Sequence, residues 1–106
     1  MKLGIIVNTN DPETVWNALR LGNEALNTGN EVSMFLLGSG VEIENIKDET
    51  FDIAGALEKF LNSVGNPLAC GTCLKLRHLD ASVCPFSSMT ELVEMICNSD
   101  KVVTLG

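Results

Sequence analysis

The sequence predicts a single α/β domain, a three-layer sandwich built on a mostly parallel sheet of five strands. Residues 3–7 and 32–37 are near-continuous apolar runs of strand length, which is the pattern of parallel strands buried on both faces. Between and after them, apolar residues recur at helical spacing, so strands and helices alternate along the chain. The 106 residues, 45% of them hydrophobic, suffice for one core and not for two. We therefore expect one domain over residues 1–106.

The first strand, helix and second strand form a βαβ unit. The strand at residues 3–7 is followed by Asp11, a favourable helix N-cap, and by Pro12, which suits the first helical position. Gly29 ends this helix before the strand at residues 32–37. The core face of the helix is predicted from its apolar residues, Val15, Ala18, Leu19, Gly22, Ala25 and Leu26.

The middle of the chain is predicted to hold a turn, an irregular segment, a helix and the third strand. Residues 38–40 (Gly-Ser-Gly) end the second strand, and the acidic residues 41–52 form a loop or an irregular short helix. Residues 53–64 have the clearest amphipathic pattern of the chain and predict a helix closed by Gly65. The third strand is short and covers residues 67–69.

The last part of the chain is predicted to contribute two strands and a helix. Residues 81–84 form a short fourth strand that Pro85 ends, and residues 101–105 form the fifth. Either Ser87 or Ser88 caps the helix between them. Four apolar residues of this helix are expected to share one face, namely Met89, Leu92, Val93 and Ile96.

Charge and composition exclude several classes of protein. The chain has seven Lys and Arg against fourteen Asp and Glu, a net charge of −7, so direct binding of nucleic acid is not expected. No apolar run approaches the roughly 18 residues of a membrane span, and residues 3–7 are too short a run for a signal peptide. We therefore expect a cytoplasmic protein without a membrane partner. Its four cysteines are then expected to be thiols.

The carboxyl ends of the predicted strands are the expected place for chemistry. In an open parallel sheet, ligands collect at this edge. Cys70 ends the third strand there. Residues 8–11 and 38–41, with Cys84 and Pro85, are expected to share the same rim and to wall a pocket around Cys70.

Cys70 is the candidate nucleophile or sulfur carrier. Two of the seven cations, Lys75 and Arg77, and the single histidine, His78, lie within eight residues of it. Nearby cations favour the thiolate, the reactive form of cysteine, so we expect the pKa of Cys70 to be lowered. Cys73, at CxxC spacing, either resolves a disulfide or persulfide on Cys70 or is a bystander. The alternative for Cys70 is a small buried hydrophobic residue at a strand end.

Several groups near Cys70 are candidates to hold an anion. Lys75, Arg77 and His78 supply positive charge, and the backbone amides of Gly71 and Thr72 form the turn after the strand. The alternative for this segment is an ordinary solvated turn. In the second strand's turn, Gly40 is a further candidate to approach an anion. The fingerprint of nucleotide sites is missing there, which favours a simple strand-ending turn.

Four cysteines also raise the question of a metal site. The cysteines after Cys70 and Cys73 are Cys84 and Cys97, so a second CxxC pair is absent. We therefore expect no metal and no other cofactor. Cys97 is expected to pack beside the core face of its helix, and no role is predicted for Cys84.

Four features of the chain occur together in a known family. They are the strand at residues 3–7, the Gly-Ser-Gly-Val turn at residues 38–41, Cys70 followed seven residues later by Arg77, and the closing residues 99–103. The chain thus resembles the DsrE/DsrF-like (YchN/TusD-like) family of small sulfur-relay proteins. The resemblance implies a flavodoxin-like fold, a persulfide on Cys70 that passes between proteins, and a homo-oligomer, either a trimer or a hexamer.

Two positions depart from the family pattern. His78 stands where the family commonly has glycine, which leaves the backbone turn there open, and Cys73 is absent from some members. We expect a sulfur carrier or sulfurtransferase that exchanges sulfur with donor and acceptor proteins through Cys70. The alternatives are a dithiol redox protein using Cys70 and Cys73, and a non-catalytic assembly or regulatory subunit. Whether the chain is an enzyme stays open.

Overall fold

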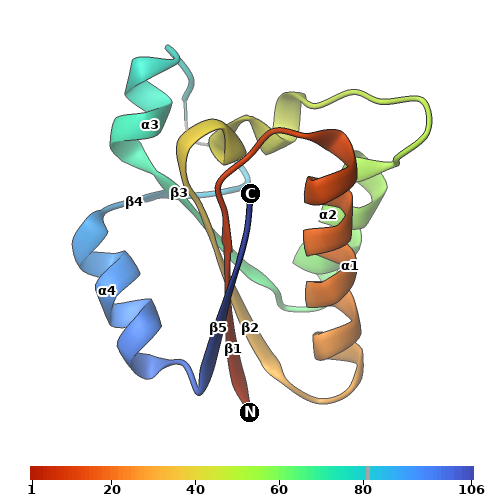
Figure 1. Ribbon diagram of the computed structural model, residues 1–106, viewed down its shortest axis with the longest axis vertical. Helices are drawn as coiled ribbons and strands as arrows, with labels where there is room; N and C mark the ends of the chain where they lie inside the picture. Colours follow the sequence, from red (N-terminus) through yellow and green to blue (C-terminus); the bar gives the residue numbers. More distant parts are fainter. Residues whose placement is uncertain (81) are drawn as a thin grey trace.

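Five parallel strands form the central sheet of the computed structural model, which describes residues 1–80 and 82–106 (Figure 1). The elements in chain order are β1 (Lys2–Val7), α1 (Pro12–Asn27), β2 (Glu31–Leu36), the 3-10 helix η1 (Gly38–Asn45), α2 (Ile53–Asn62), β3 (Asn66–Cys70), α3 (Gly71–Leu76), β4 (Phe86–Ser87), α4 (Met89–Asn98) and β5 (Lys101–Leu105). None of the described helices is both long and apolar enough to cross a membrane.

The strand order is β4-β3-β2-β1-β5, and every neighbouring pair is parallel. The predicted α/β sandwich with a parallel five-stranded sheet is confirmed. Strands β1, β2, β3 and β5 lie where the apolar runs predicted them. All strands point the same way, and η1 and α3 lie at their carboxyl ends (Figure 1).

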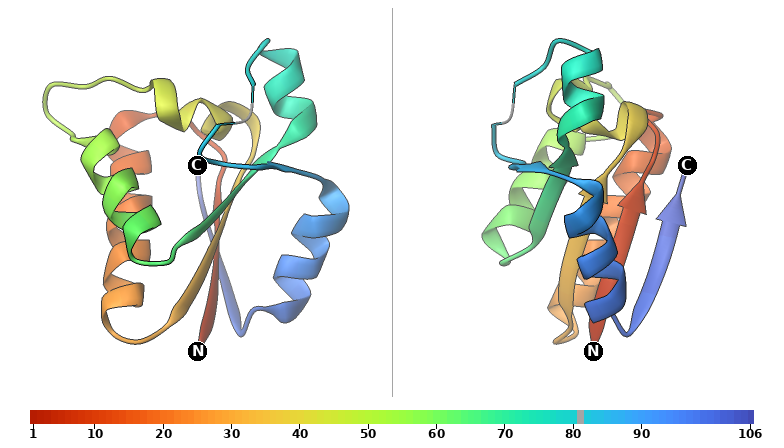
Figure 2. Two further views of the ribbon diagram at one scale, coloured as in Figure 1. Left: turned by 180° about the vertical axis from the view of Figure 1, so that it is seen from behind. Right: turned by 90° about the vertical axis from the view of Figure 1, so that its left-hand side faces the viewer.

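Helices α1 and α2 cover one face of the sheet, and α4 lies on the other (Figure 2). A Cβ atom at Gly22 of α1 would lie 3.5 Å from Ile5, so the odd-numbered residues of β1 face α1. A Cβ atom at Gly4 would lie 3.2 Å from Met95 of α4, so the even-numbered residues face α4. Paired residues of neighbouring parallel strands point to the same face of the sheet. The pairing of β1 with β2, and of β2 with β3, therefore assigns the residues of β2 and β3 to the two faces as well.

Two predicted helix ends show how local sequence sets the boundaries. Asp11 caps α1, with its carboxylate accepting a hydrogen bond from the Thr14 amide (3.0 Å), and Pro12 is the first helical residue, as predicted. Helix α2 ends at Asn62, two residues earlier than predicted. The left-handed residue after it is Val64, with φ of 65°, and Gly65 then donates to the Phe60 carbonyl (2.8 Å).

The fourth strand was predicted in the wrong place. Ala81 lies outside the described residues, and Ser82 to Cys84 form bends instead of a strand. The observed β4 comes after Pro85, whose carbonyl accepts a hydrogen bond from Ala69 of β3 (2.9 Å). Proline has no backbone N–H to donate, but its carbonyl still accepts a hydrogen bond. Pro85 therefore begins the pairing of β4 with β3, where we expected it to end a strand.

The four apolar residues predicted to share one face of α4 do not form its buried face. Ser88 caps this helix, and its buried residues are Leu92 and Met95. Met89, Val93 and Ile96 are exposed, by 55%, 57% and 42%. Because α4 rests on β1 near Gly4, only the stripe through Leu92 and Met95 reaches the sheet. The other apolar side chains therefore face outward.

Candidate functional site

Cys70 ends β3 and stands directly before α3, at the carboxyl end of the sheet. Residues of β3 on its face of the sheet point toward the α4 side, and Cys70 is only 4% exposed. The strand pairs with β2 on one side and with the short β4 on the other, where Cys70 is opposite Ser87. The candidate nucleophile therefore lies in a packed environment between two strands.

Cys73 lies three residues further on in α3, and its sulfur accepts a hydrogen bond from the Gly38 amide (3.3 Å). Gly38 has φ of 55°, a left-handed conformation that glycine adopts without strain, and this turn aims its N–H at the sulfur. Burial raises the pKa of Cys73, and the adjacent Cys70 thiol raises it further as a hydrogen-bond partner and a like charge. The Gly38 amide and the charge of Arg77 act against this rise. The Cys70 thiol therefore acts directly on Cys73.

Arg77 follows α3 and ties this segment to η1. Its Nε donates to Glu42 Oε2 (3.0 Å), and its Nη1 donates to the Cys73 carbonyl (3.2 Å). The Arg77 and Glu42 side chains are 32% and 34% exposed. Glu42 also accepts a long hydrogen bond from Asn10 (3.5 Å), which brings in the loop after β1. The rim expected at the carboxyl ends of β1, β2 and β3 is therefore present.

Glu42 was missed from the sequence. It was read as one acidic residue among several in a loop, although it follows the Gly-Ser-Gly-Val turn that was placed at this rim. Glu42 is the acidic residue nearest the Gly-Ser-Gly-Val turn, and its nearness to a rim that also carries Arg77 was the signal that could have identified the pair.

The other candidates lie around this pair without converging on the thiols. Lys75 and Thr72 are exposed on α3. His78 is exposed and has φ of 54°.

The two candidate glycines lie in closely packed turns. A Cβ atom at Gly71 would lie 2.9 Å from the Phe86 ring, so a larger residue would push against β4. Gly40 is buried with its N–H donating to the Leu37 carbonyl (3.0 Å), and a Cβ atom there would collide with the Val7 carbonyl.

The remaining two cysteines differ sharply in environment. Cys84 is 2% exposed, and burial raises its pKa to about 12, with a smaller contribution from the charge of Glu44. Cys97 is exposed on α4, so the prediction that it packs beside the core was wrong. All four cysteines are free thiols. Within residues 1–80 and 82–106, no three His, Cys, Asp or Glu side chains gather as metal ligands.

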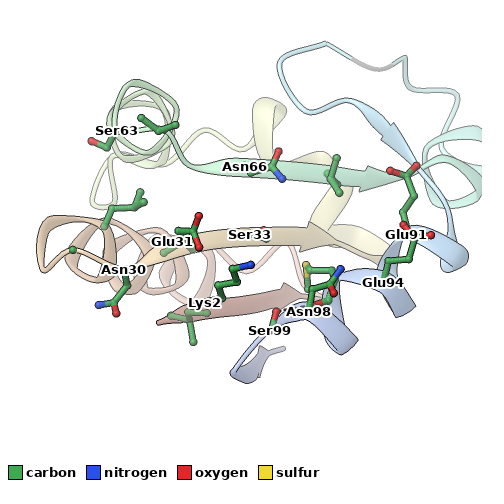
Figure 3. Close-up of a pocket in the computed structure, with 17 residues that line it drawn as sticks. Lys2, Asn30, Glu31, Ser33, Ser63, Asn66, Glu91, Glu94, Asn98 and Ser99 are labelled. Atoms are coloured by element: carbon green, nitrogen blue, oxygen red, sulfur yellow. Dashed lines mark hydrogen bonds between the residues drawn. The ribbon is translucent and has the colours of Figure 1, made fainter.

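A cavity of about 700 Å³ lies at the opposite end of the sheet (Figure 3). Polar residues from the first halves of the strands line it together with residues of α4, among them Lys2, Glu31, Ser33, Asn66, Glu91, Glu94 and Asn98. A smaller cavity of about 320 Å³ lies beside η1 and α3. Cys70 lines neither, so these cavities do not form the pocket expected around it.

The packed thiols, the Gly38 turn and the arginine coincide with a family match along the chain. Residues 1–105 match the DsrE/DsrF-like family. The chain belongs to this family. It is also 31% identical, over 114 aligned residues, to an uncharacterized protein of Methanocaldococcus jannaschii, an alignment that covers 98% of this chain and 99% of the relative.

The structure shows the backbone turn at His78, which the sequence left open. His78 has φ of 54°, the left-handed conformation that glycine favours. Histidine tolerates this region better than most side chains. The turn after Arg77 is therefore left-handed, and it presents an exposed imidazole.

Proposed function

We propose that this protein is a cytosolic sulfur carrier of the DsrE/DsrF-like family, with a persulfide formed on Cys70. The observation that carries the proposal is the position of Cys70 at the carboxyl end of β3, with a second thiol and Arg77 on the segment that follows. Membership of the family supports it. If the chain acts as an enzyme, it is a sulfurtransferase by the same chemistry.

Loading and unloading are both thiolate exchanges. The Cys70 thiolate attacks the outer sulfur of a donor persulfide, a new S–S bond forms, and the donor's S–S bond breaks as the donor leaves as a thiolate. An acceptor thiolate then attacks the outer sulfur on Cys70 and regenerates the Cys70 thiolate. The two exchanges need no external oxidant, reductant or cofactor, since sulfane sulfur moves with its oxidation state unchanged.

The neighbours of Cys70 have distinct proposed tasks. The raised pKa of Cys73 keeps this thiol protonated near neutral pH, so it donates a hydrogen bond to the Cys70 thiolate and does not compete with it as a nucleophile. Arg77, whose charge already acts on the neighbouring Cys73, offsets the negative charge of the loaded sulfur. The exposed His78, Thr72 and Lys75 lie on the surface that a donor or acceptor meets, and the buried Gly40 lets η1 pack closely against the end of β1.

The test is intact-mass spectrometry of the reduced protein after incubation with a cysteine desulfurase and cysteine. The wild type and Cys73→Ser are expected to gain about 32 mass units, the mass of one sulfur atom, and Cys70→Ser is expected to gain none. An adduct that persists in Cys70→Ser, or no adduct on the wild type, would contradict the proposal.

A dithiol redox protein is the second candidate. It is favoured because the Cys70 thiol directly raises the pKa of Cys73. Oxidation would join the two sulfurs, with two protons and two electrons passing to an added oxidant such as a small disulfide. The reduced protein would then lose two mass units, and Cys70→Ser or Cys73→Ser would abolish this loss. A two-unit loss without any sulfur adduct would favour the redox function over the carrier.

We further propose that the protein is a homo-oligomer, a trimer or hexamer, that meets sulfur donors and acceptors as separate proteins. Exposed apolar side chains on the α4 side of the sheet support this, namely Met89, Val93 and Ile96 of α4 with Val102 of the edge strand β5. Sedimentation should show Val93→Glu as smaller than the wild type. Val64→Glu, an equal charge at an exposed valine outside this patch, should leave the size unchanged.

A further inference from the structure

Ser87 ends β4 and Ser88 follows it directly before α4, but the hydroxyl of only one of them makes a hydrogen bond in the described part of the chain. Ser88 caps α4, with its hydroxyl accepting a hydrogen bond from the Glu91 amide (3.3 Å). The Ser87 hydroxyl is buried and makes no hydrogen bond with any group in the described part of the chain. Since buried polar groups are nearly always paired, this unpaired hydroxyl requires an explanation.

The unpaired hydroxyl belongs to the residue directly opposite the proposed carrier cysteine. In the parallel pairing of β3 with β4, Cys70 is opposite Ser87. Paired residues of neighbouring strands project to the same face of the sheet, so the hydroxyl and the sulfur are neighbours on one face. Cys70 is itself 4% exposed, so water does not compete freely at this position.

The Ser87 hydroxyl does not bond the sulfur of reduced Cys70. A persulfide extends the side chain by a second sulfur, about 2.05 Å beyond the first. That outer sulfur carries the negative charge and accepts hydrogen bonds. We propose that the Ser87 hydroxyl is the hydrogen-bond donor for the outer sulfur of the Cys70 persulfide, a partner that exists only when the carrier is loaded.

This inference rests on the proposed function and makes it more specific. A donor placed in advance, with no partner in the unloaded protein, stabilises the loaded form selectively. A hydrogen bond to a charged group changes an equilibrium by about tenfold or more. Ser87 would therefore shift sulfur exchange toward the loaded carrier without changing the reactivity of the empty Cys70 thiol.

The experiment compares three variants at neighbouring positions. Ser87→Ala removes the hydroxyl, Ser87→Thr restores one, and Ser88→Ala removes the adjacent hydroxyl as a matched control. Each reduced protein is equilibrated with glutathione persulfide over a range of ratios to glutathione, and the loaded fraction is read by intact mass. Ser87→Ala is expected to load with an equilibrium constant about tenfold lower, whereas Ser87→Thr and Ser88→Ala load like the wild type.

Two further measurements separate this role from a structural one. Removing an unpaired buried hydroxyl should leave the unfolding free energy of Ser87→Ala unchanged or higher, whereas Ser88→Ala loses its cap and is less stable. Alkylation of empty Cys70 should proceed at the wild-type rate in Ser87→Ala. Equal loading of Ser87→Ala and the wild type would overturn the role of Ser87 and leave the carrier function standing. A wild type that does not load would overturn both.

Discussion

The two ends of the sheet differ sharply on the face that α4 covers. Along β2, this face carries Glu31, Ser33 and then Phe35, and along β3 it carries Asn66 near the start and Cys70 at the end. Glu31 and Asn66 are exposed at the edge of the 700 Å³ cavity, whereas Phe35 is fully buried and Cys70 nearly so. The proposed chemistry therefore lies at the dry, packed end. The open polar cavity lies at the other end and does not include Cys70.

The largest test of this contrast is a pair of substitutions in one strand. Phe35 and Ser33 lie two residues apart on the same face of β2. Phe35→Ala is expected to cost about 3–5 kcal/mol of unfolding free energy because it leaves a cavity in packed surroundings. Ser33→Ala is expected to change it by less than about 0.5 kcal/mol. Urea denaturation measures both, and similar losses would show that the two ends are equally packed.

The pH dependence of stability tests how dry the packed end is. Burial raises the pKa of Cys84 from 9.0 to about 12. Above pH 9, the unfolded chain releases this proton while the folded chain retains it. The unfolding free energy should therefore fall as pH rises from about 9 to about 12, by up to about 1.4 kcal/mol per unit.

Cys84→Ala supplies the control for this pH dependence. The variant lacks the titrating thiol, so its unfolding free energy should fall less steeply than that of the wild type over the same pH range. Denaturation midpoints at several pH values between 8 and 10.5 suffice for the comparison. Identical slopes would mean that water reaches Cys84 in the folded protein.

The sequence was sufficient for most of the fold, since the apolar runs that form β1, β2, β3 and β5 carry a strong local signal. It was insufficient for β4, where two residues are paired by contact with β3 and have no pattern of their own. At the site, Cys70 and Arg77 stood out by type and position. Glu42 did not, because its partner lies 35 residues away and only the fold brings them together.

Two left-handed residues extend the comparison to the backbone. Val64 (φ 65°) borders the cavity at the amino end, and His78 (φ 54°) follows α3 at the carboxyl end. Val64 is 86% exposed, so Val64→Gly removes backbone strain without loss of packing and should stabilise the fold by about 1 kcal/mol. His78→Gly should stabilise it less, because histidine tolerates this conformation better than valine. Denaturant midpoints that rank the two variants in the opposite order would contradict this explanation.

The smallest expected effect concerns the ion pair that joins η1 to α3. Glu42→Gln should change the unfolding free energy by less than about 0.5 kcal/mol, because both partners are about one-third exposed. The main effect of Glu42→Gln should be on the reactivity of Cys73. Arg77 lowers the pKa of Cys73, so removing the carboxylate that offsets its charge should speed Cys73 alkylation at pH 8 by a few-fold. Glu58→Gln, a neutralised carboxylate on the exposed face of α2, is the control.

The opposite substitution decides whether this pair acts through charge or through contact. Arg77→Gln removes the positive charge, so Cys73 alkylation should become slower, in the opposite direction to Glu42→Gln. If the pair serves only to hold η1 against α3, both substitutions release the same contact, and both should speed alkylation by exposing the sulfur. Rates that change in opposite directions therefore indicate an electrostatic role, and rates that rise together indicate a clamp over the thiols.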